Sequence, residues 1–274
     1  MIKSETQLSV ETQALANEML LVDTHAHIDF DDFSDDRTEV ITRSNALGVK
    51  HIFVPAVTQQ TWSKTIRVCQ QHNCCELALG LHPVFIEQHQ PQHLNQLDEL
   101  IKQHSPIAVG EIGLDFYSEE LLEYKEKQIA FFTKQLIIAK RHNLPVIIHN
   151  RKAHDECLKL LSEHQLKGGI LHAFNGSIQQ AEKYIELGFL LGFGGMLTFD
   201  RSNKLRKLVE QLPIQSIVLE TDSPDMTVCQ HKGQRNSPEN IPYVLDAVCA
   251  IKKVSKQEIA SITTNNALSL IHST

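Results

Sequence analysis

Histidines and carboxylates that could bind metal ions stand directly after short apolar runs at several places in the chain. The first run is followed by His25 and His27, which the period-two alternation of a strand would direct to the same side. Later runs end in the other members of this set, Glu111, His149, His172 and Asp222. Imidazole and carboxylate groups suit Zn, Mn or another divalent first-row ion better than Ca. These residue types in these places therefore predict a metal centre.

Ordinary structural roles are the alternative for each residue taken singly. A lone His-x-His pair is more often packing or surface than ligand, a lone Glu111 could be a solvated turn residue, and Asp222 could cap a helix. All six residues, however, lie beside Val, Ile and Leu, an environment that penalises an unpaired polar group. A shared metal resolves that conflict, and we favour it for the set as a whole.

Six ligands are too many for one tetrahedral zinc and suit two divalent ions, Mg, Mn or Zn, that share a carboxylate. We expect His25, His27 and Asp222 at one ion. We expect His149 and His172 at the other ion, with Glu111 between the two. Such a pair of ions lowers the pKa of an attacking water toward neutrality. Asp222 is predicted to accept the proton of that water, which makes Asp222 and Glu111 the expected catalytic residues.

The elements that must position these residues alternate between two patterns. Short apolar runs rich in Val, Ile and Leu are typical of strands buried on both faces. They lie at Leu20–Asp23, His51–Ala56, Glu76–Gly80, Pro106–Gly110, Pro145–His149, Gly169–Ala173, Phe189–Gly194 and Ser216–Glu220. Segments with helical spacing lie at Asp35–Leu47, Thr58–His72, Gln92–His104, Glu119–His142, Lys152–Glu163, Ile178–Leu187, Ser202–Leu212 and Pro238–Ile251. A last helix, Lys256–Ile271, is expected to pack outside them.

Eight strand signals alternating with eight helix signals predict a parallel sheet closed into a (β/α)8 TIM barrel, in which chemistry sits at the carboxyl ends of the strands. A doubly wound open sheet is the alternative, because a count of units does not show closure. No linker or composition break divides residues 1–274, so we expect a single domain. Thr58, Ser177 and Ser237 are candidate helix caps, and His89 is among the histidines expected on the solvated surface.

The net charge limits which nucleic acids the protein could bind, and the cysteines indicate its cellular compartment. Lys and Arg number 26 against 33 Asp and Glu, a formal charge of −7, whereas a protein that grips long duplex DNA usually has a basic surface. A nucleic-acid substrate would therefore be an end or a short strand, attracted locally by metal charge. The six cysteines form no C-x-x-C pair, and the chain shows neither a signal-peptide run nor a membrane-length apolar run. We expect a cytoplasmic protein with no membrane association and infer no obligate protein partner.

Several motifs together resemble the TatD family of metal-dependent deoxyribonucleases and have its spacing. They are Asp23–Asp29, Gly80–Pro83, Gly110–Asp115, His149–Arg151, His172–Phe174 and Glu220–Pro224. The similarity runs from about Leu20 to the C-terminus, and Gly192–Gly195 and the loop Asp225–Glu239 resemble the YjjV-like branch. Met1–Met19 lies outside it as an extension of unassigned role. The resemblance implies an amidohydrolase-superfamily barrel, two divalent ions, the ligand set given above and hydrolysis of phosphodiesters in DNA.

Five further residues are predicted to act around the metals. His82 is expected to contact substrate or a leaving oxygen, with a structural histidine as the alternative. Arg151 could hold a phosphate through its planar fork rather than form a surface salt bridge, and Arg235 could meet a nucleic-acid backbone unless its loop is only a solvated connection. Asp29 and Asp115 are expected to orient ligands through hydrogen bonds.

The function predicted from these features is metal-dependent hydrolysis of phosphodiesters, as a DNase that trims DNA, with 3′-to-5′ action on single-stranded ends as its more specific form. The alternative within the same superfamily is an amidase, lactonase or esterase that acts on a small molecule. Many amidohydrolases bridge their metals with a carbamylated lysine where this chain has Glu111. A non-catalytic metal-binding scaffold is a third class, against which the intact ligand set argues.

Overall fold

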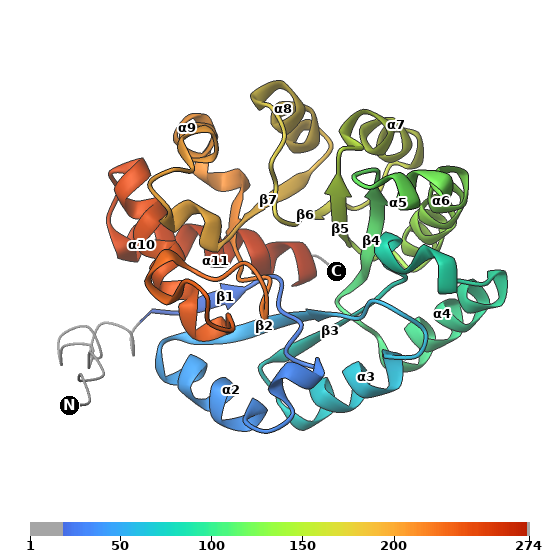
Figure 1. The fold of residues 1–274 in the computed structure, drawn as a ribbon, viewed down its shortest axis with the longest axis horizontal. Coiled ribbons are helices and arrows are strands. Elements are labelled where there is room, and N and C mark those ends of the chain that lie inside the picture. The colour runs from blue at the N-terminus through green and yellow to red at the C-terminus, as the bar shows by residue number, and fades with distance from the viewer. Residues whose placement is uncertain (1–18, 273–274) are drawn as a thin grey trace.

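Eight parallel strands surrounded by helices make up the part of the chain that the computed structural model describes, residues 19–272 (Figure 1). The predicted extension Met1–Met19 lies outside the described residues except for its last residue. The strands are β1 (Leu21–Asp23), β2 (Val49–Pro55), β3 (Cys75–Leu79), β4 (Ala108–Asp115), β5 (Val146–Arg151), β6 (Gly169–Leu171), β7 (Phe189–Phe193) and β8 (Ile217–Leu219). They follow one another around the sheet in sequence order.

The first and last strands meet through the residues that follow them, at a junction we call the seam (residues 23–27 and 221–223). There the amide of Asp222 donates to the carbonyl of His25 at 2.8 Å, and the amide of His27 donates to the carbonyl of Ser223 at 2.8 Å. The sheet therefore closes into a barrel, as predicted, and the open doubly wound alternative is wrong.

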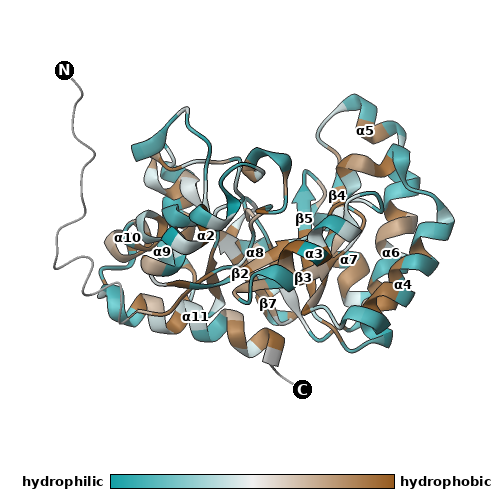
Figure 2. Ribbon diagram, turned by 90° about the horizontal axis from the view of Figure 1, so that it is seen from below, coloured by the Kyte–Doolittle hydropathy of each residue, from teal (hydrophilic) through white to brown (hydrophobic). Residues whose placement is uncertain are grey.

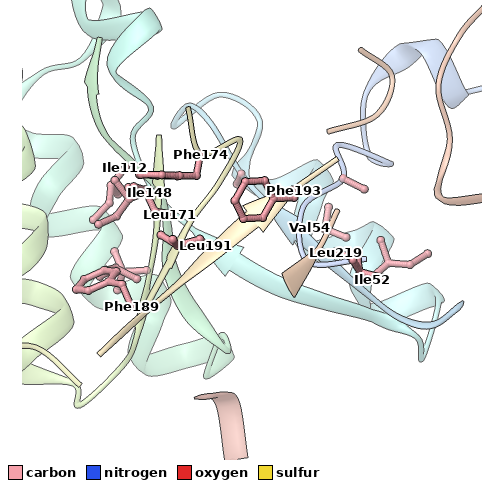
Figure 3. Close-up of a cluster of buried hydrophobic side chains, with 14 of the residues drawn as sticks. Ile52, Val54, Ile112, Ile148, Leu171, Phe174, Phe189, Leu191, Phe193 and Leu219 are labelled. Atoms are coloured by element: carbon pink, nitrogen blue, oxygen red, sulfur yellow. The ribbon is translucent and has the colours of Figure 1, made fainter. Parts of the chain in front are cut away.

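Residues on each strand alternate between the barrel interior and the surrounding helices. Ile147 belongs to an apolar cluster with residues from six other strands, and such residues can meet only inside a closed sheet. Ile148, the next residue, faces the opposite way and packs in the outer cluster, which lies between the strands and the helices (Figure 3). The inner cluster comprises Val22, Phe53, Ala78, Ala108, Ile147, Ile170, Val218 and Ala267. Two residues beyond Ile147 and Ile170, the same alternation directs His149 and His172 inward, above this apolar floor.

Helices fill the outer layer, one or more between each pair of strands. They are α2 (Arg37–Ala46), α3 (Trp62–Gln71), α4 (Pro91–His104), α5 (Glu119–Glu123), α6 (Lys125–Arg141), α7 (His154–His164), α8 (Ile178–Glu186), α9 (Asn203–Gln211) and α10 (Ile241–Lys252). Short 3-10 turns lie at Asp31–Phe33, Pro83–Gln88, Gly195–Thr198, Ile214–Ser216, Cys229–His231 and Pro238–Asn240. No helix in residues 19–272 is both long and apolar enough to span a membrane.

The helix predicted at Glu119–His142 is two helices. The chain leaves helical geometry at Tyr124 (φ −97°, ψ 14°), between α5 and α6. The side chain of Gln128 donates to the carbonyl of Leu121 at 2.8 Å, beside the backbone amide of Tyr124 at 3.2 Å, and so supports the end of α5. This tertiary contact was not visible in the helical spacing.

The last helix, α11 (Lys256–His272), closes the amino-terminal end of the barrel instead of packing outside it as predicted. It crosses the middle of the ring in Figure 1 and lies below the strands in Figure 2. Ala267 is fully buried in the inner cluster, and Leu268 and Leu270 pack against the same cluster. The helix lies there because the apolar interior would otherwise face water at that end.

Of the three predicted caps, only Ser177 is confirmed. Its hydroxyl accepts from the amide of Gln180 at the start of α8. Thr58 lies before the N-cap of α3, which is Thr61, and its hydroxyl donates to the Thr61 hydroxyl. Ser237 precedes a 3-10 turn and caps it with no side-chain hydrogen bond. The capping predictions at Thr58 and Ser237 are therefore wrong, because each hydroxyl has a partner other than the first-turn amides.

Candidate metal centre

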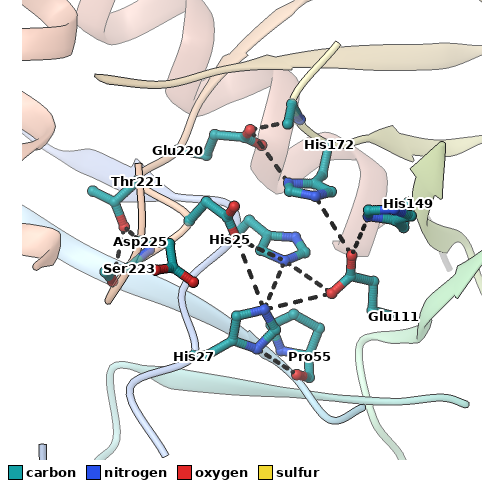
Figure 4. Close-up of polar contacts among 12 residues, drawn as sticks. His25, His27, Pro55, Glu111, His149, His172, Glu220, Thr221, Ser223 and Asp225 are labelled. Atoms are coloured by element: carbon teal, nitrogen blue, oxygen red, sulfur yellow. Dashed lines mark hydrogen bonds and ion pairs between the residues drawn. The ribbon is translucent and has the colours of Figure 1, made fainter. Parts of the chain in front are cut away.

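All six predicted ligands meet at the carboxyl end of the barrel, and all but Asp222 are labelled in Figure 4. We divide their side chains into two groups by the two oxygens of Glu111. In the first group, Nε2 of His25 lies 3.3 Å from Nε2 of His27, 3.2 Å from Oε2 of Glu111 and 3.7 Å from Oδ1 of Asp222. Nε2 of His27 lies 3.5 Å from the same Glu111 oxygen and 3.8 Å from the same Asp222 oxygen. We call these four atoms site A.

The second group surrounds the other oxygen of Glu111. Its Oε1 lies 3.4 Å from Nδ1 of His149, 3.5 Å from Nε2 of His172 and 3.0 Å from Nε2 of His82. We call Glu111 Oε1 with the His149 and His172 nitrogens site B. Glu111 thus directs one carboxylate oxygen to each site, which is the bridging position predicted for it.

The donor atoms of site A fit a cation. Nδ1 of His27 lies 3.2 Å from the carbonyl of Pro55, which can only accept, so this nitrogen carries the ring proton. Its Nε2 therefore turns a lone pair toward Glu111 and Asp222, whose oxygens are acceptors as well. Oε2 of Glu111 is buried and has no hydrogen-bond donor among the described residues. Acceptors buried together in this way require a positive charge between them.

Site B is oriented by a carboxylate behind one of its ligands. Nε2 of His149 donates to Oδ2 of Asp115 at 2.9 Å, so Nδ1 is the nitrogen that faces site B. Asp115 therefore does what was predicted for it. Asp29 does not, since it accepts the hydroxyl of Thr65 at 2.6 Å and makes no hydrogen bond with a ligand histidine. A backbone carbonyl, not a carboxylate, orients His27.

Glu111 lies within a strand, because β4 continues to Asp115 rather than ending at Gly110 as predicted. The pairing of β4 with β5 is irregular between Val109 and Ile112 and then resumes, with Gly113 opposite His149 and Asp115 opposite Arg151. The backbone passes close by here: a Cβ on Gly113, at φ +141°, would stand 1.9 Å from the carbonyl oxygen of His149. This pairing is what places Asp115 beside His149.

Two buried carboxylates that the sequence analysis did not assign lie beneath the ligands. Asp23 accepts the hydroxyl of Thr221 at 2.6 Å, and burial raises its pKa to about 8. Glu220 accepts the amide of Ala173 at 2.6 Å and lies 3.5 Å from Nδ1 of His172. A Cβ on Gly192 would stand 2.1 Å from Oε2 of Glu220, so a larger residue there would displace this carboxylate. The signal was available, since both carboxylates end apolar strand runs.

Burial and charge oppose each other in this cluster. Burial disfavours the ionised form of Glu111, but the surrounding imidazoles, His82 foremost, hold the pKa of that carboxyl well below its ordinary value. Burial raises the pKa of Asp222 to about 6 against the effect of nearby histidines. Burial alone would lower the pKa of His172, yet the neighbouring carboxylates, Asp222 foremost, raise it to about 10. The cluster as a whole attracts positive charge.

His82 faces this cluster as a hydrogen-bond donor. Its Nδ1 accepts the backbone amide of Val84 at 3.0 Å, which leaves the ring proton on Nε2, 3.0 Å from Oε1 of Glu111. Burial lowers the pKa of His82 to about 4, so the ring is neutral at neutral pH. His89, expected on the solvated surface, is instead buried. Its Nε2 lies 2.9 Å from the carbonyl oxygen of His82 and donates a hydrogen bond to it, because a carbonyl can only accept. It helps to hold His82 in place.

A cavity of about 640 Å³ opens beside the two sites, with His149, His172 and Asp222 in its wall. The rest of its lining is largely apolar, with Phe174, Phe193, Met196, Leu205 and Leu208, and it includes three cations, Arg151, Arg201 and Lys204. Arg201 and Lys204 were missed by the sequence analysis, because cations at the start of an exposed helix look like an ordinary solvated face.

The two arginines predicted to bind substrate lie in different environments. Arg151 lines the cavity, as a phosphate contact would require. Arg235 donates to both carboxylate oxygens of Asp36, at 2.9 and 2.6 Å, and its guanidinium lies over the ring of Phe33. Its donors are thus engaged within the protein and it does not line the cavity, so its contact with nucleic acid stays a prediction.

Comparison with known proteins agrees with this geometry. Residues 22–272 match the family model described as TatD related DNase, which is nearly the whole described chain and includes all six predicted ligands. The chain belongs to the TatD family of metal-dependent hydrolases. The TatD relative YjjV of Escherichia coli, named an uncharacterized metal-dependent hydrolase, is 37% identical over 254 residues, covering 92% of this chain and 97% of YjjV. Its crystal structure superimposes with a TM-score of 0.88.

Other relatives extend the family across kingdoms. A human TatD protein named Deoxyribonuclease TATDN3 is 33% identical over 261 residues, covering 91% of this chain and 94% of that protein. An uncharacterized amidohydrolase from Saccharomyces cerevisiae shares the fold, with a TM-score of 0.75 at 19% identity, over 92% of this chain and 99% of that one. This chain and the yeast protein therefore share the barrel fold at low sequence identity.

Proposed function

We propose that this TatD chain is a phosphodiesterase with two divalent ions, Mg, Mn or Zn, that cleaves DNA at ends or in short strands. The observation that carries the proposal is the position of Glu111, which offers one oxygen to each of two groups of ligands beside a cavity with three cations. Ions bound at sites A and B would acidify an attacking water and polarise a phosphoryl oxygen.

The protein groups around the two sites have the properties that such a hydrolysis needs. Asp222, with a pKa that burial raises to about 6, is suited to accept the proton of the attacking water near neutral pH. The protonated Nε2 of neutral His82 is placed to donate a hydrogen bond to a phosphoryl or leaving oxygen at site B. The His82 nitrogen is not among the seven atoms of sites A and B, and Asp222 would accept the proton on the carboxylate oxygen that is not part of site A.

DNA is supported as the substrate by charge and by relatives. Arg151, Arg201 and Lys204 at the cavity favour an anionic substrate. The chain nevertheless carries a formal charge of −7, which disfavours extended contact with duplex DNA and favours a strand end that enters the cavity. The human relative is named a deoxyribonuclease. We propose 3′-to-5′ trimming of single-stranded ends as the specific reaction, in the cytoplasm, where the six unpaired cysteines would stay reduced.

A second candidate is a small-molecule lactonase, esterase or amidase, which the apolar part of the cavity favours. Phe174, Phe193 and Leu205 would bury an aliphatic or aromatic group as readily as a nucleobase. The metal chemistry would be the same for both candidates, and only the part of the substrate next to the cleaved bond would differ.

One panel of substrates separates these candidates. Protein reconstituted with Mg, Mn or Zn would be assayed against labelled single-stranded DNA, a chromogenic phosphodiester, and a set of lactones, esters and amides. We expect cleavage of the two phosphodiesters, with products that shorten from the 3′ end. Turnover of lactones with inert phosphodiesters would overturn the proposal in favour of the second candidate.

A further inference from the structure

The guanidinium of Arg151 lies flat on the ring of Tyr117. Its central carbon is 3.4 Å from the ring centroid. An edge-on guanidinium would push a nitrogen about 1.3 Å closer to the ring, inside van der Waals contact, so only parallel stacking allows this distance. Tyr117 therefore fixes the plane of Arg151.

This stack stands at the mouth of the cavity, next to the metal centre. Arg151 is exposed, ends β5, and follows the site B ligand His149 by two residues. The pairing of β4 with β5 sets Asp115 opposite Arg151, which brings Tyr117, two residues beyond Asp115, alongside. The tyrosine is 51% exposed, an unusual position for an aromatic ring that has only a structural role.

The positive charge of Arg151 acts on the carboxylate of Asp115 from a distance but forms no ion pair with it. Among residues 19–272, no carboxylate or carbonyl accepts a hydrogen bond from the Arg151 guanidinium. Five of the seven other arginines donate to a protein oxygen, whereas Arg67 and Arg201, like Arg151, make no such bond with residues 19–272; the five are Arg37, Arg43, Arg141, Arg206 and Arg235. Lys152 adds a second cation, with its ammonium 4.7 Å from the Tyr117 centroid. The backbone of Lys152 lies in the left-handed region (φ +55°). This conformation is costly for a residue other than glycine, and residues that adopt it cluster at functional sites.

We propose that Arg151, braced by Tyr117, is a stacking site for one unpaired base of a single-stranded substrate at the mouth of the cavity. Guanidinium planes and aromatic rings stack on any nucleobase, and the free N–H edges of Arg151 with Lys152 would meet the adjoining phosphates. Paired bases keep their faces covered by their neighbours, so the site selects single strands over duplex. The inference rests on the proposed function and adds to it Tyr117 and Lys152 as determinants of strand recognition.

Binding is the direct test. Metal-loaded protein would be titrated with a fluorescent phosphorothioate hexathymidylate, which resists cleavage, and anisotropy would give Kd. We expect Tyr117→Ala to raise Kd at least about fivefold, and Arg151→Lys, which keeps the charge but loses the plane, to do the same. Tyr117→Phe keeps the ring and should stay within about twofold of wild type. Tyr243→Ala removes a half-buried tyrosine on α10 that packs against His231, and serves as the matched control.

Kinetics separates a stacking site from a structural one. The loss of kcat/KM in Tyr117→Ala should be at least about fivefold larger for an oligonucleotide than for an abasic deoxyribose-phosphate oligomer of the same length, which has no base to stack. Equal losses on both substrates, or an unchanged Kd for the strand in Tyr117→Ala, would overturn the stacking site. If wild type bound the strand through Tyr117 but hydrolysed only lactones, the proposed function would fail while the stacking site stood.

Discussion

Asp222 is the residue on which the proposed chemistry depends most. It approaches His25 and His27 at site A, and burial keeps its pKa near the working pH. Asp222→Asn retains an oxygen of similar position but cannot accept a proton. We therefore expect metal content to stay near that of wild type while kcat falls at least about a hundredfold. Metal analysis of the purified variant beside its steady-state kinetics tests this, and near wild-type turnover would refute the role.

Protons and metal ions should compete at site B. Without an ion, nearby carboxylates outweigh burial and raise the pKa of His172 to about 10, so the ring is protonated at neutral pH. That proton must leave when a cation binds, and it leaves less readily as the pH falls. We expect the affinity for Zn or Mn to drop about tenfold for each unit between pH 8 and pH 6. Competition against a chelator of known affinity measures this, and a flat profile would contradict it.

That the six proposed ligands lie together could be predicted at the residue scale, because their positions follow local rules. Strand alternation and strand ends identify His149 and His172 without knowledge of their neighbours. Tyr117 and Arg201 could not be found in this way, since their significance comes from what lies beside them in space. His89 illustrates the same limit in reverse, because a polar local sequence surrounds a side chain that the fold buries.

At the scale of elements, α6 holds the ends of two strands in place with two buried glutamines. Gln128 accepts the amide of Asp115 at 2.8 Å and donates to its carbonyl at 3.0 Å. Gln135, two turns later, does the same for Leu81, at 2.8 and 3.2 Å. Each amide thus replaces a missing strand neighbour, Gln128 for the last residue of β4 and Gln135 for a residue just beyond β3. The helix therefore transmits its position to the metal centre.

Gln128→Leu should weaken metal binding as well as the fold. The change leaves buried backbone groups of Asp115 without partners, at a cost of about 2–4 kcal/mol in the free energy of unfolding. Because Asp115 orients His149, we also expect lower metal occupancy. Chemical denaturation and metal analysis of the same preparation measure the two effects.

Gln135→Leu is the matched control, since it breaks the same two kinds of hydrogen bond at Leu81. It leaves the hydrogen bond from His149 to Asp115 in place, although the ring of the neighbouring His82 lies 4.5 Å from that of His149. We expect similar destabilisation with metal content preserved. Equal metal loss in both variants would mean that general loosening of the barrel, rather than the orientation of His149, controls the site.

Element boundaries were predictable only where local pattern decides them. The alternation of apolar runs and helical segments located all eight strands, because burial on both faces demands such runs. The extension of β4 to Asp115 depends on pairing with β5, and the break at Tyr124 depends on Gln128. The position of α11 depends on the open end of the barrel. None of these can be read from one segment alone.

At the scale of the whole molecule, site A lies on the seam that closes the barrel. His25 and His27 belong to one side of the seam and Asp222 to the other. A bound ion would therefore link the first strand to the last. At a thousandfold excess over its Kd, a ligand that binds only the folded state stabilises it by about 4 kcal/mol.

Chelation should consequently loosen the seam before other parts of the barrel. We expect EDTA to lower the midpoint of thermal unfolding by roughly 10 °C for a chain of this size. Hydrogen exchange should rise most at the amides of His27 and Asp222, which bond across the seam. Exchange that rises evenly over all eight strands, or an unchanged midpoint, would contradict this expectation.

The seam also sets an order for assembly on the ribosome. Synthesis delivers His25 and His27 first, but Asp222, their partner across the seam, only with the eighth strand. Every ligand of site B has been made by His172, well before that point. A nascent chain can therefore gather site B early, whereas site A is complete only when the last strand has emerged and the cylinder can close.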